Sequence, residues 1–248
     1  MDRTFKCREC SGPTVAYEIQ GVWIPLVCER CRKAELARRN RARVAELDSQ
    51  LKVIVPALYR ATDGNHPHID QTLLGKILEW KVGGKGIGLF GPTGGCKTRM
   101  MFLLVRKLHY LEHKVRWIRA IDLSRAASGI FDDDSAIKGN ARKLLKNALQ
   151  AEVLFIDDLG KERFTDRSEL ELYHLIESRT SCLRPILWTS NASGSDLRDL
   201  MSENRGTAIT RRLAEFSTVY PVQPYYERAN PIEQFDKTSR SAARGGAV

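Results

Sequence analysis

One segment of this 248-residue chain has the composition of a phosphate-binding loop. It reads GPTGGCKT and lies between an apolar run at 86–90 and a helix-forming run that begins at Lys97. Backbone N–H groups at a helix N-terminus bind phosphate, because they are unpaired there and the helix dipole favours anions. Lys97 would reach the β- and γ-phosphates of ATP, and the Thr98 hydroxyl would bind Mg²⁺. The expected nucleotide-binding residues are Gly91, Pro92, Thr93, Gly94, Gly95, Cys96, Lys97 and Thr98.

Cys96 departs from the usual pattern of such loops, G-x-x-x-x-G-K-[ST], which has glycine at that position. We expect its side chain to crowd the phosphates. A degenerate site that binds ATP with weak turnover is therefore one alternative, and a glycine-rich turn with a chance lysine is another.

A pair of carboxylates follows about 60 residues later, in AEVLFIDDLG. Four apolar residues lead into Asp157 and Asp158, so both acids lie at the end of a buried strand. Asp157 would hold the Mg²⁺ shell, and Asp158 would orient or deprotonate the attacking water. The simpler alternative is a helix cap beside an uninvolved acid. The loop, the lysine and the acid pair together predict ATP hydrolysis.

Four of the six cysteines form two CxxC pairs separated by 17 residues: Cys7, Cys10, Cys28 and Cys31. Two such turns complete a tetrahedron around Zn²⁺ and leave no open position for a substrate, so the predicted site is structural. About 33 residues cannot build a self-sufficient core, so the metal must supply much of the folding free energy. Dithiol redox chemistry is the alternative. We expect Cys182, outside this pattern, to be buried and inert.

The net charge of +10 is concentrated in one segment. Residues 30–43 hold seven basic residues and one acid, which gives this segment a net charge of +6. Such a block favours a polyanion or an acidic protein surface. A solvated helix face is the simpler interpretation. Helix formers with helical spacing at 29–51 place the block on a helix that ends before Pro56.

Apolar runs at 86–91, 114–121, 151–157 and 184–190 predict strands, and the intervening segments 97–113, 141–150 and 167–180 predict helices. Strands without polar alternation indicate a parallel sheet covered on both faces. We expect an α/β fold in which a zinc-ribbon-like module at 1–33 and a basic linker helix at 34–60 precede an ATPase domain at 61–228. A disordered tail at 229–248 would follow.

Composition places the chain among ordinary globular proteins, with 42% hydrophobic and 28% charged residues. No run approaches the length of a membrane span, and the charged N-terminus lacks the apolar stretch of a secretory signal. These features predict a cytoplasmic protein.

Together these motifs resemble the helicase-loader branch of the AAA+ ATPases, the DnaC/DnaI type, with the IstB transposition helpers as close relatives. The resemblance spans residues 55–228. It rests on GPTGGCKT, on LFIDDLG followed about 30 residues later by ILWTSN, and on AITRRL. It implies the AAA+ fold.

The resemblance also implies roles for four further residues. Asn191 matches the polar residue that senses the γ-phosphate, although a polar turn after a strand would look the same. Arg212 matches the arginine finger, with Arg211 as the runner-up; a surface salt bridge is the competing interpretation. An arginine finger acts on a neighbouring subunit, so this role requires a homo-oligomer. Arg228 is a weaker match to a second sensor of the nucleotide.

Members of this branch are ATP-controlled switches that bind single-stranded DNA and a hexameric replicative helicase. We therefore expect a helicase loader in DNA replication that uses ATP, Mg²⁺ and Zn²⁺. An ATPase that assists a transposase is the first alternative, and a non-hydrolysing ATP-binding adaptor is the second.

Overall fold

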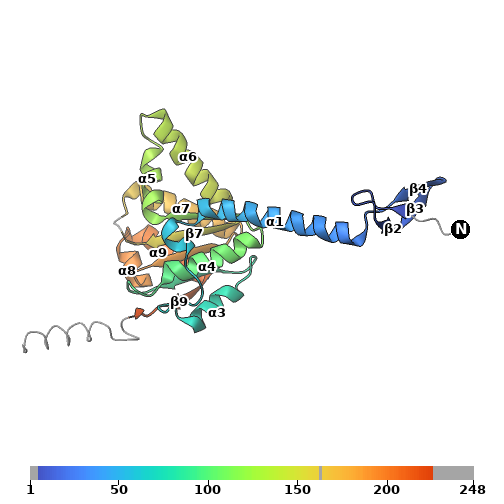
Figure 1. The fold of residues 1–248 in the computed structure, drawn as a ribbon. Helices are drawn as coiled ribbons and strands as arrows, with labels where there is room; N and C mark the ends of the chain where they lie inside the picture. Colours follow the sequence, from blue (N-terminus) through green and yellow to red (C-terminus); the bar gives the residue numbers. More distant parts are fainter. Residues whose placement is uncertain (1–4, 162–163, 226–248) are drawn as a thin grey trace, which may run out of the picture. The chain divides into compact units, whose positions relative to one another are not determined.

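The computed structural model describes residues 5–161 and 164–225, and Figure 1 traces the elements along the chain. The chain divides into two compact units, residues 1–51 and 52–248. The helix α1 (Glu29–Ile54) begins in the first unit and ends just inside the second. It stops two residues before Pro56, as expected because proline disfavours helical backbone in the preceding residue. None of the described helices is both long and apolar enough to cross a membrane.

The first unit contains two antiparallel strand pairs and the cysteines. One pair is β1 (Phe5–Lys6) with β2 (Pro13–Thr14), and the other is β3 (Ala16–Ile19) with β4 (Val22–Pro25). Most apolar side chains of β3 and β4 are exposed. Among the described residues 5–51, Cys7 and Leu47 are the buried apolar residues, which is less core than a small domain needs to be stable by itself. The dependence of this unit on a metal stays a prediction.

The second unit is built on a five-stranded sheet in which all neighbouring strands are parallel. The strands are β5 (Gly86–Phe90), β6 (Val115–Arg119), β7 (Val153–Leu159), β8 (Ile186–Ser190) and β9 (Ser217–Pro221). Their order across the sheet is β6-β7-β8-β5-β9. The prediction of an α/β fold with a parallel sheet is confirmed. Because β8 lies between β5 and β7, the phosphate loop and the acid pair belong to strands that are not direct neighbours.

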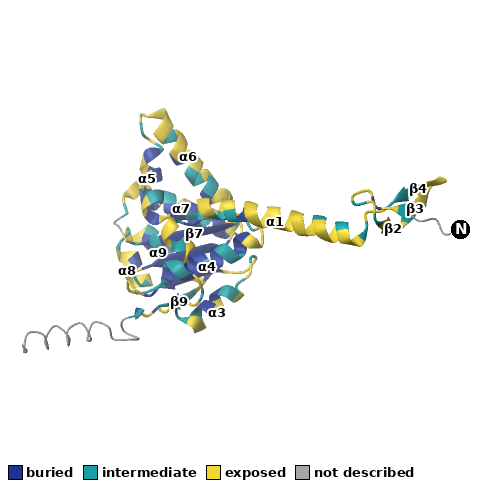
Figure 2. Cartoon of the chain, in the orientation of Figure 1, coloured by how far each residue is buried: buried dark blue, intermediate teal, exposed yellow. Residues whose placement is uncertain are grey.

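Helices cover both faces of this sheet (Figure 1). On one face α4 (Lys97–Tyr110) packs with α3 (Gln71–Glu79), and the other face is covered mainly by α5 (Ala120–Gly129), α7 (Asp166–Ser181) and α9 (Glu203–Glu215). The remaining helices are α2 (Ala57–Arg60), α6 (Ser135–Gln150) and α8 (Gly194–Asp199). Figure 2 shows buried residues concentrated on the strands and on α4.

The side chains of β7 point alternately to the two faces of the sheet, and they are apolar on both, so both faces must be covered by helices. Phe155 packs edge-on against Phe102 of α4, at 5.3 Å between ring centroids. Leu154 and Ile156 belong to the cluster that includes Leu172 of α7. A strand that is apolar on both faces is stable only inside such a layered fold.

The fully buried Arg179 fixes the starts of β7 and β8. Its guanidinium donates hydrogen bonds to the carbonyls of Ala148 and Ala151, at 2.8 and 2.9 Å, and of Pro185 at 3.0 Å. Two of these acceptors lie at the end of α6, where the helix dipole favours a cation. Burial lowers the pKa of Arg179 to about 10, so it remains charged at neutral pH.

Candidate functional site: a phosphate loop facing an acid pair

The phosphate loop connects β5 to α4, and its lysine is buried. The Lys97 ammonium donates hydrogen bonds of 2.6 Å to the carbonyl of Gly91 and 2.8 Å to that of Pro92. Burial lowers the pKa of Lys97, and the carboxylates Asp158 and Asp157 oppose this effect. The structure thus places a desolvated cation at the carboxyl end of the sheet, where parallel α/β folds bind their ligands.

Cys96 has a left-handed backbone, with φ 58° and ψ 22°, directly before α4. Side chains other than glycine are disfavoured in this conformation, because Cβ approaches the following carbonyl oxygen. The sequence had suggested crowding of the phosphates as the reason for glycine at this position. The structure adds a backbone reason that applies whether or not a nucleotide is bound.

The chain after β9 lies directly against the phosphate loop. The Val222 N–H donates to Phe90 at 2.8 Å, and the Tyr225 N–H donates to Gly94 at 3.2 Å. A Cβ at Gly91 would lie 2.2 Å from the Val222 carbonyl oxygen, and one at Gly95 would lie 2.6 Å from a Val222 methyl. These two glycines are therefore required by close packing in addition to any contact with phosphate.

Asp157 is the centre of the acid site. Its Oδ1 accepts a hydrogen bond of 2.8 Å from the Thr98 hydroxyl at the start of α4 and one of 2.6 Å from the Thr189 hydroxyl on β8. The residue is only 5% exposed, and burial raises its pKa despite the two hydroxyl donors. Burial of a carboxylate is costly unless cations lie close to it, which makes this position suited to a metal ion.

Asp158 follows with a backbone φ of 58°. Its N–H donates to the Thr189 hydroxyl at 2.9 Å, and its carboxylate pairs with Lys161 at 3.2 Å. The register of β7 on β8 is interrupted between Ile156 and Leu159, which coincides with this left-handed residue. The two adjacent acids consequently differ in environment: Asp157 is buried, whereas Asp158 is partly exposed.

These residues fit a magnesium–nucleotide group. Mg²⁺ prefers oxygen ligands and is usually held by one or two protein oxygens together with phosphate and water. Thr98 and Asp157 provide a hydroxyl and a carboxylate whose oxygens already lie within hydrogen-bonding distance of each other. Lys97 would add positive charge beside the phosphates.

Known proteins match this chain in sequence and in fold. The model of the IstB-like ATP binding protein family matches residues 24–229, most of the chain. The chain belongs to this family. A Mycobacterium tuberculosis relative, Rv3427c, is 26% identical over 163 residues and is described as an ATP-binding protein in an insertion sequence. That alignment covers 64% of this chain and 63% of the relative, so it leaves more than a third of the relative unmatched.

Two solved structures are similar in fold to this IstB-like protein. The structure described as DnaI has a TM-score of 0.52 and 17% identity, over 66% of this chain and 84% of the other. The structure described as the DnaC helicase loader has a TM-score of 0.51 and 20% identity, over 70% of this chain and 99% of the other. At these identities the likeness establishes the AAA+ fold, and with the family match it confirms the resemblance drawn from the motifs.

Thr189 is a site residue that the sequence analysis missed. It lies one position before the Ser190-Asn191 pair and contacts both acids of the site. Asn191, the expected γ-phosphate sensor, directly follows β8 and is exposed. The two polar residues that end β8, Thr189 and Ser190, were the available signal. Only the order of the strands shows that Thr189 lies beside Asp157.

Arg212 lies on α9, where it forms an ion pair of 2.7 Å with Glu177 of α7. It also lines a hollow of about 370 Å³ with Ile186 and Ser217, which begin β8 and β9. This is the amino end of the sheet, opposite the phosphate loop of the same chain. Arg211, the other candidate, is exposed on the same helix. Arg228 lies outside the described residues.

The four paired cysteines converge on one centre. Their sulfur atoms all lie within 4.8 Å of one another, and Cys10 and Cys28 are 3.6 Å apart. Tetrahedral zinc with Zn–S bonds of about 2.3 Å separates its sulfurs by roughly 3.7 Å, so the arrangement fits the ion. The Cys28 N–H donates to the sulfur of Cys7 at 3.2 Å, and this contact contributes most to lowering the pKa of Cys7 to about 6.

Two of these cysteines differ in acidity. A hydrogen bond to Cys10 raises the pKa of Cys31 to about 12, whereas the pKa of Cys7 is lowered. A bound divalent ion would hold all four sulfurs as thiolates. In contrast, Cys182 is exposed, so the expectation that it is buried was wrong: α7 ends at Ser181 and the cysteine follows its last turn.

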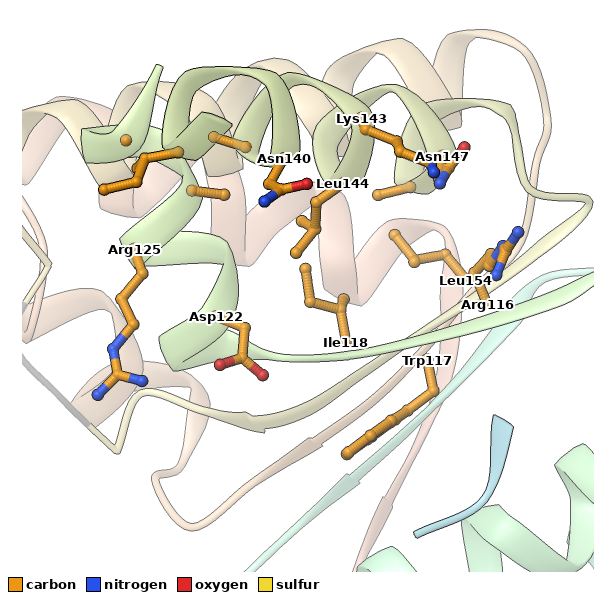
Figure 3. A pocket seen from close by; sticks show the side chains of 15 residues that line it. Arg116, Trp117, Ile118, Asp122, Arg125, Asn140, Lys143, Leu144, Asn147 and Leu154 are labelled. Carbon is orange, nitrogen blue, oxygen red and sulfur yellow. The ribbon is translucent and has the colours of Figure 1, made fainter. Parts of the chain in front are cut away.

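A separate hollow of about 580 Å³ lies between β6 and the helices α5 and α6 (Figure 3). Ile118 and Leu144 form part of its apolar wall, and the side chain of Asn140 points toward it from α6. None of the residues expected at the phosphate site lines this hollow.

Proposed function

We propose that this IstB-like protein hydrolyses ATP and uses the cycle to load a replicative helicase onto DNA. The observation that carries the ATPase part of the proposal is the contact of Thr98 and Thr189 with the same oxygen of Asp157. It supports a site in which the start of the phosphate-binding helix, the metal-binding acid and the intervening strand act together.

Each residue has a definite task in the proposed reaction. Lys97 would neutralise the β- and γ-phosphates, and Thr98 and Asp157 would hold a magnesium ion, which would offset the charge of the phosphates. Asp158, partly exposed beside this centre, orients the attacking water and accepts its proton. Asn191, which directly follows β8, senses the γ-phosphate. Arg212 of a neighbouring subunit stabilises the charge of the transition state in a homo-oligomer.

Loading of a helicase is favoured by the fold match to the DnaC helicase loader, which spans nearly all of that structure. On this proposal ATP holds an assembled state that binds single-stranded DNA and the hexameric helicase, and hydrolysis releases it. The four-cysteine module at 1–33, with zinc bound, and the basic helix at 34–60 precede the ATPase domain and provide additional surface for partners.

A second candidate is an ATPase that assists DNA transposition. It is favoured by the family match and by the M. tuberculosis relative that is described as part of an insertion sequence. Both candidates require ATP binding and differ in the partner protein.

The test has two stages. ATP binding and turnover are first measured for the wild type and for Lys97→Ala; we expect turnover in the wild type and loss of binding in the variant. Absence of wild-type turnover would leave only an ATP-binding adaptor. Binding to a hexameric replicative helicase and to a transposase from the same host is then compared. Stable binding to the transposase alone would overturn helicase loading.

A further inference from the structure

The N-terminal half of α1 is the most strongly charged surface of the first unit. Residues 30–43 carry a net charge of +6, and all of their basic residues are exposed. These residues are Arg30, Arg32, Lys33, Arg38, Arg39, Arg41 and Arg43. Figure 2 shows α1 largely in the colour of exposed residues.

The charges lie on opposite sides of this helix. Arg32 and Arg41 are nine residues apart, and at 100° per residue they project about 180° from each other. The other arginines divide in the same way: Arg30 and Arg38 lie toward the side of Arg41, and Arg39 and Arg43 toward the side of Arg32. The apolar residues of α1 do not gather on one side, so the helix lacks the stripe with which a surface helix packs against a partner.

The acidic residues of α1 pair with some of these basic residues and leave, within the described part of the chain, an arginine without an ion pair on each side of the helix. Lys33 pairs with Glu29 at 2.7 Å, Glu35 pairs with Arg38 and Arg39, and Arg43 pairs with Glu46 at 2.9 Å. Such exposed pairs within one helix are weak and exchange readily for stronger anions. Arg32 and Arg41 form no ion pair within residues 5–161 and 164–225.

We propose that α1 binds in the major groove of duplex DNA and contacts the phosphates of both groove walls. An α-helix with its side chains is about 10–12 Å across and the major groove is about 12 Å wide, so a helix fits with each side near one backbone. A single strand offers one row of phosphates and would use one side of α1. An acidic protein surface would likewise face only one side. The two-sided distribution of arginine therefore favours the duplex.

The test measures binding of the full chain to a duplex and to a single strand of the same length, over a range of salt concentrations. The variant is Arg32→Gln/Arg41→Gln, which keeps good helix formers. The control Lys76→Gln/Lys85→Gln removes two exposed charges from the second unit. We expect the glutamine variant to bind the duplex roughly tenfold more weakly, or weaker still, at moderate salt. The slope of its log affinity against log salt concentration should fall by an amount that corresponds to about two phosphate contacts. Arg32→Lys/Arg41→Lys should restore both.

Three results would overturn the proposal: duplex affinity within twofold of the wild type in the glutamine variant, an equal loss in the lysine control, or a loss confined to the single strand. Helix content by circular dichroism checks that the variant is folded. The proposal does not depend on hydrolysis. A protein that binds the duplex through α1 but turns over no ATP would support it and contradict the proposed ATPase.

Discussion

The hydroxyl of Thr189 donates a hydrogen bond of 2.6 Å to Oδ1 of Asp157 and accepts one of 2.9 Å from the Asp158 N–H. This side chain therefore fixes both acids of the proposed site relative to β8. Its hydroxyl acts on the proposed site through these two acids, so Thr189 is a positioning residue.

Replacing Thr189 by valine keeps the shape and removes the hydroxyl. We expect the catalytic rate to fall about 10–100-fold, since small misplacements of catalytic groups have large kinetic effects. Nucleotide affinity should change by only a few fold, because Lys97 and the loop remain. The matched control is Thr180→Val, which removes another buried hydroxyl that bonds only within α7. Equal losses in the two variants would indicate a general packing defect instead.

Glycine at position 96 should relieve the left-handed strain of Cys96. We expect Cys96→Gly to raise the free energy of unfolding by about 0.5–1 kcal/mol, because the strain of roughly 1–2 kcal/mol exceeds the entropic cost of glycine. Denaturant unfolding measures this. Cys182→Gly is the control: its φ of −93° is ordinary, so the same change there should destabilise or be neutral. Stabilisation by the control alone would contradict the prediction.

Asp157→Asn should stabilise the protein at neutral pH when magnesium and nucleotide are absent. Burial raises the pKa of Asp157 above its ordinary value of 3.8, so the folded state holds the proton more tightly than the unfolded state. The stabilisation from this group is complete below pH 3.8 and is lost as the pH rises through the raised pKa. Asparagine cannot ionise and avoids this loss. The melting temperatures of the wild type and of Asp157→Asn, measured from acid to neutral pH, should diverge only above pH 3.8.

Removal of metal should unfold the first unit and leave the second folded. Structural zinc contributes about 10–16 kcal/mol to the folding of small modules. We expect one zinc ion per chain in the purified protein and none in Cys28→Ser. Cys182→Ser, which changes an exposed cysteine outside the cluster, should retain the metal. Metal analysis and proteolysis with and without a chelator provide the measurements. A protein isolated without zinc that nevertheless resists proteolysis at 5–33 would refute the metal site.

Arg212→Ala should lower turnover about 10³-fold while leaving ATP binding intact, if this arginine completes the site of a neighbouring subunit. Its ion pair with Glu177 offers a competing structural role. Glu177→Gln separates the two, since it weakens the pair but leaves the arginine in place. Normal turnover in Glu177→Gln, and recovery of activity when Arg212→Ala is mixed with Lys97→Ala, would fit a role in trans. Arg211→Ala tests the runner-up. Full activity of Arg212→Ala would remove Arg212 from the site.

The sequence by itself determined the local chemistry of this protein. The loop 91–98, the acid pair and the cysteine spacing could all be recognised, because each depends on residues close together in the chain. Apolar strands without alternation were sufficient to predict a parallel sheet with helices on both faces. The basic block was also evident, as were the beginning and the approximate end of its helix.

Only the tertiary structure decided how these parts meet. The position of β8 between β5 and β7 aims Thr189 at Asp157, and no local pattern encodes which strand lies between two others. The left-handed backbone of Cys96 is set by the folded loop, and the contact of Val222 with Gly91 and Gly95 brings together segments more than 100 residues apart. Sequence spacing fixes which groups are available, and long-range packing fixes their distances and directions.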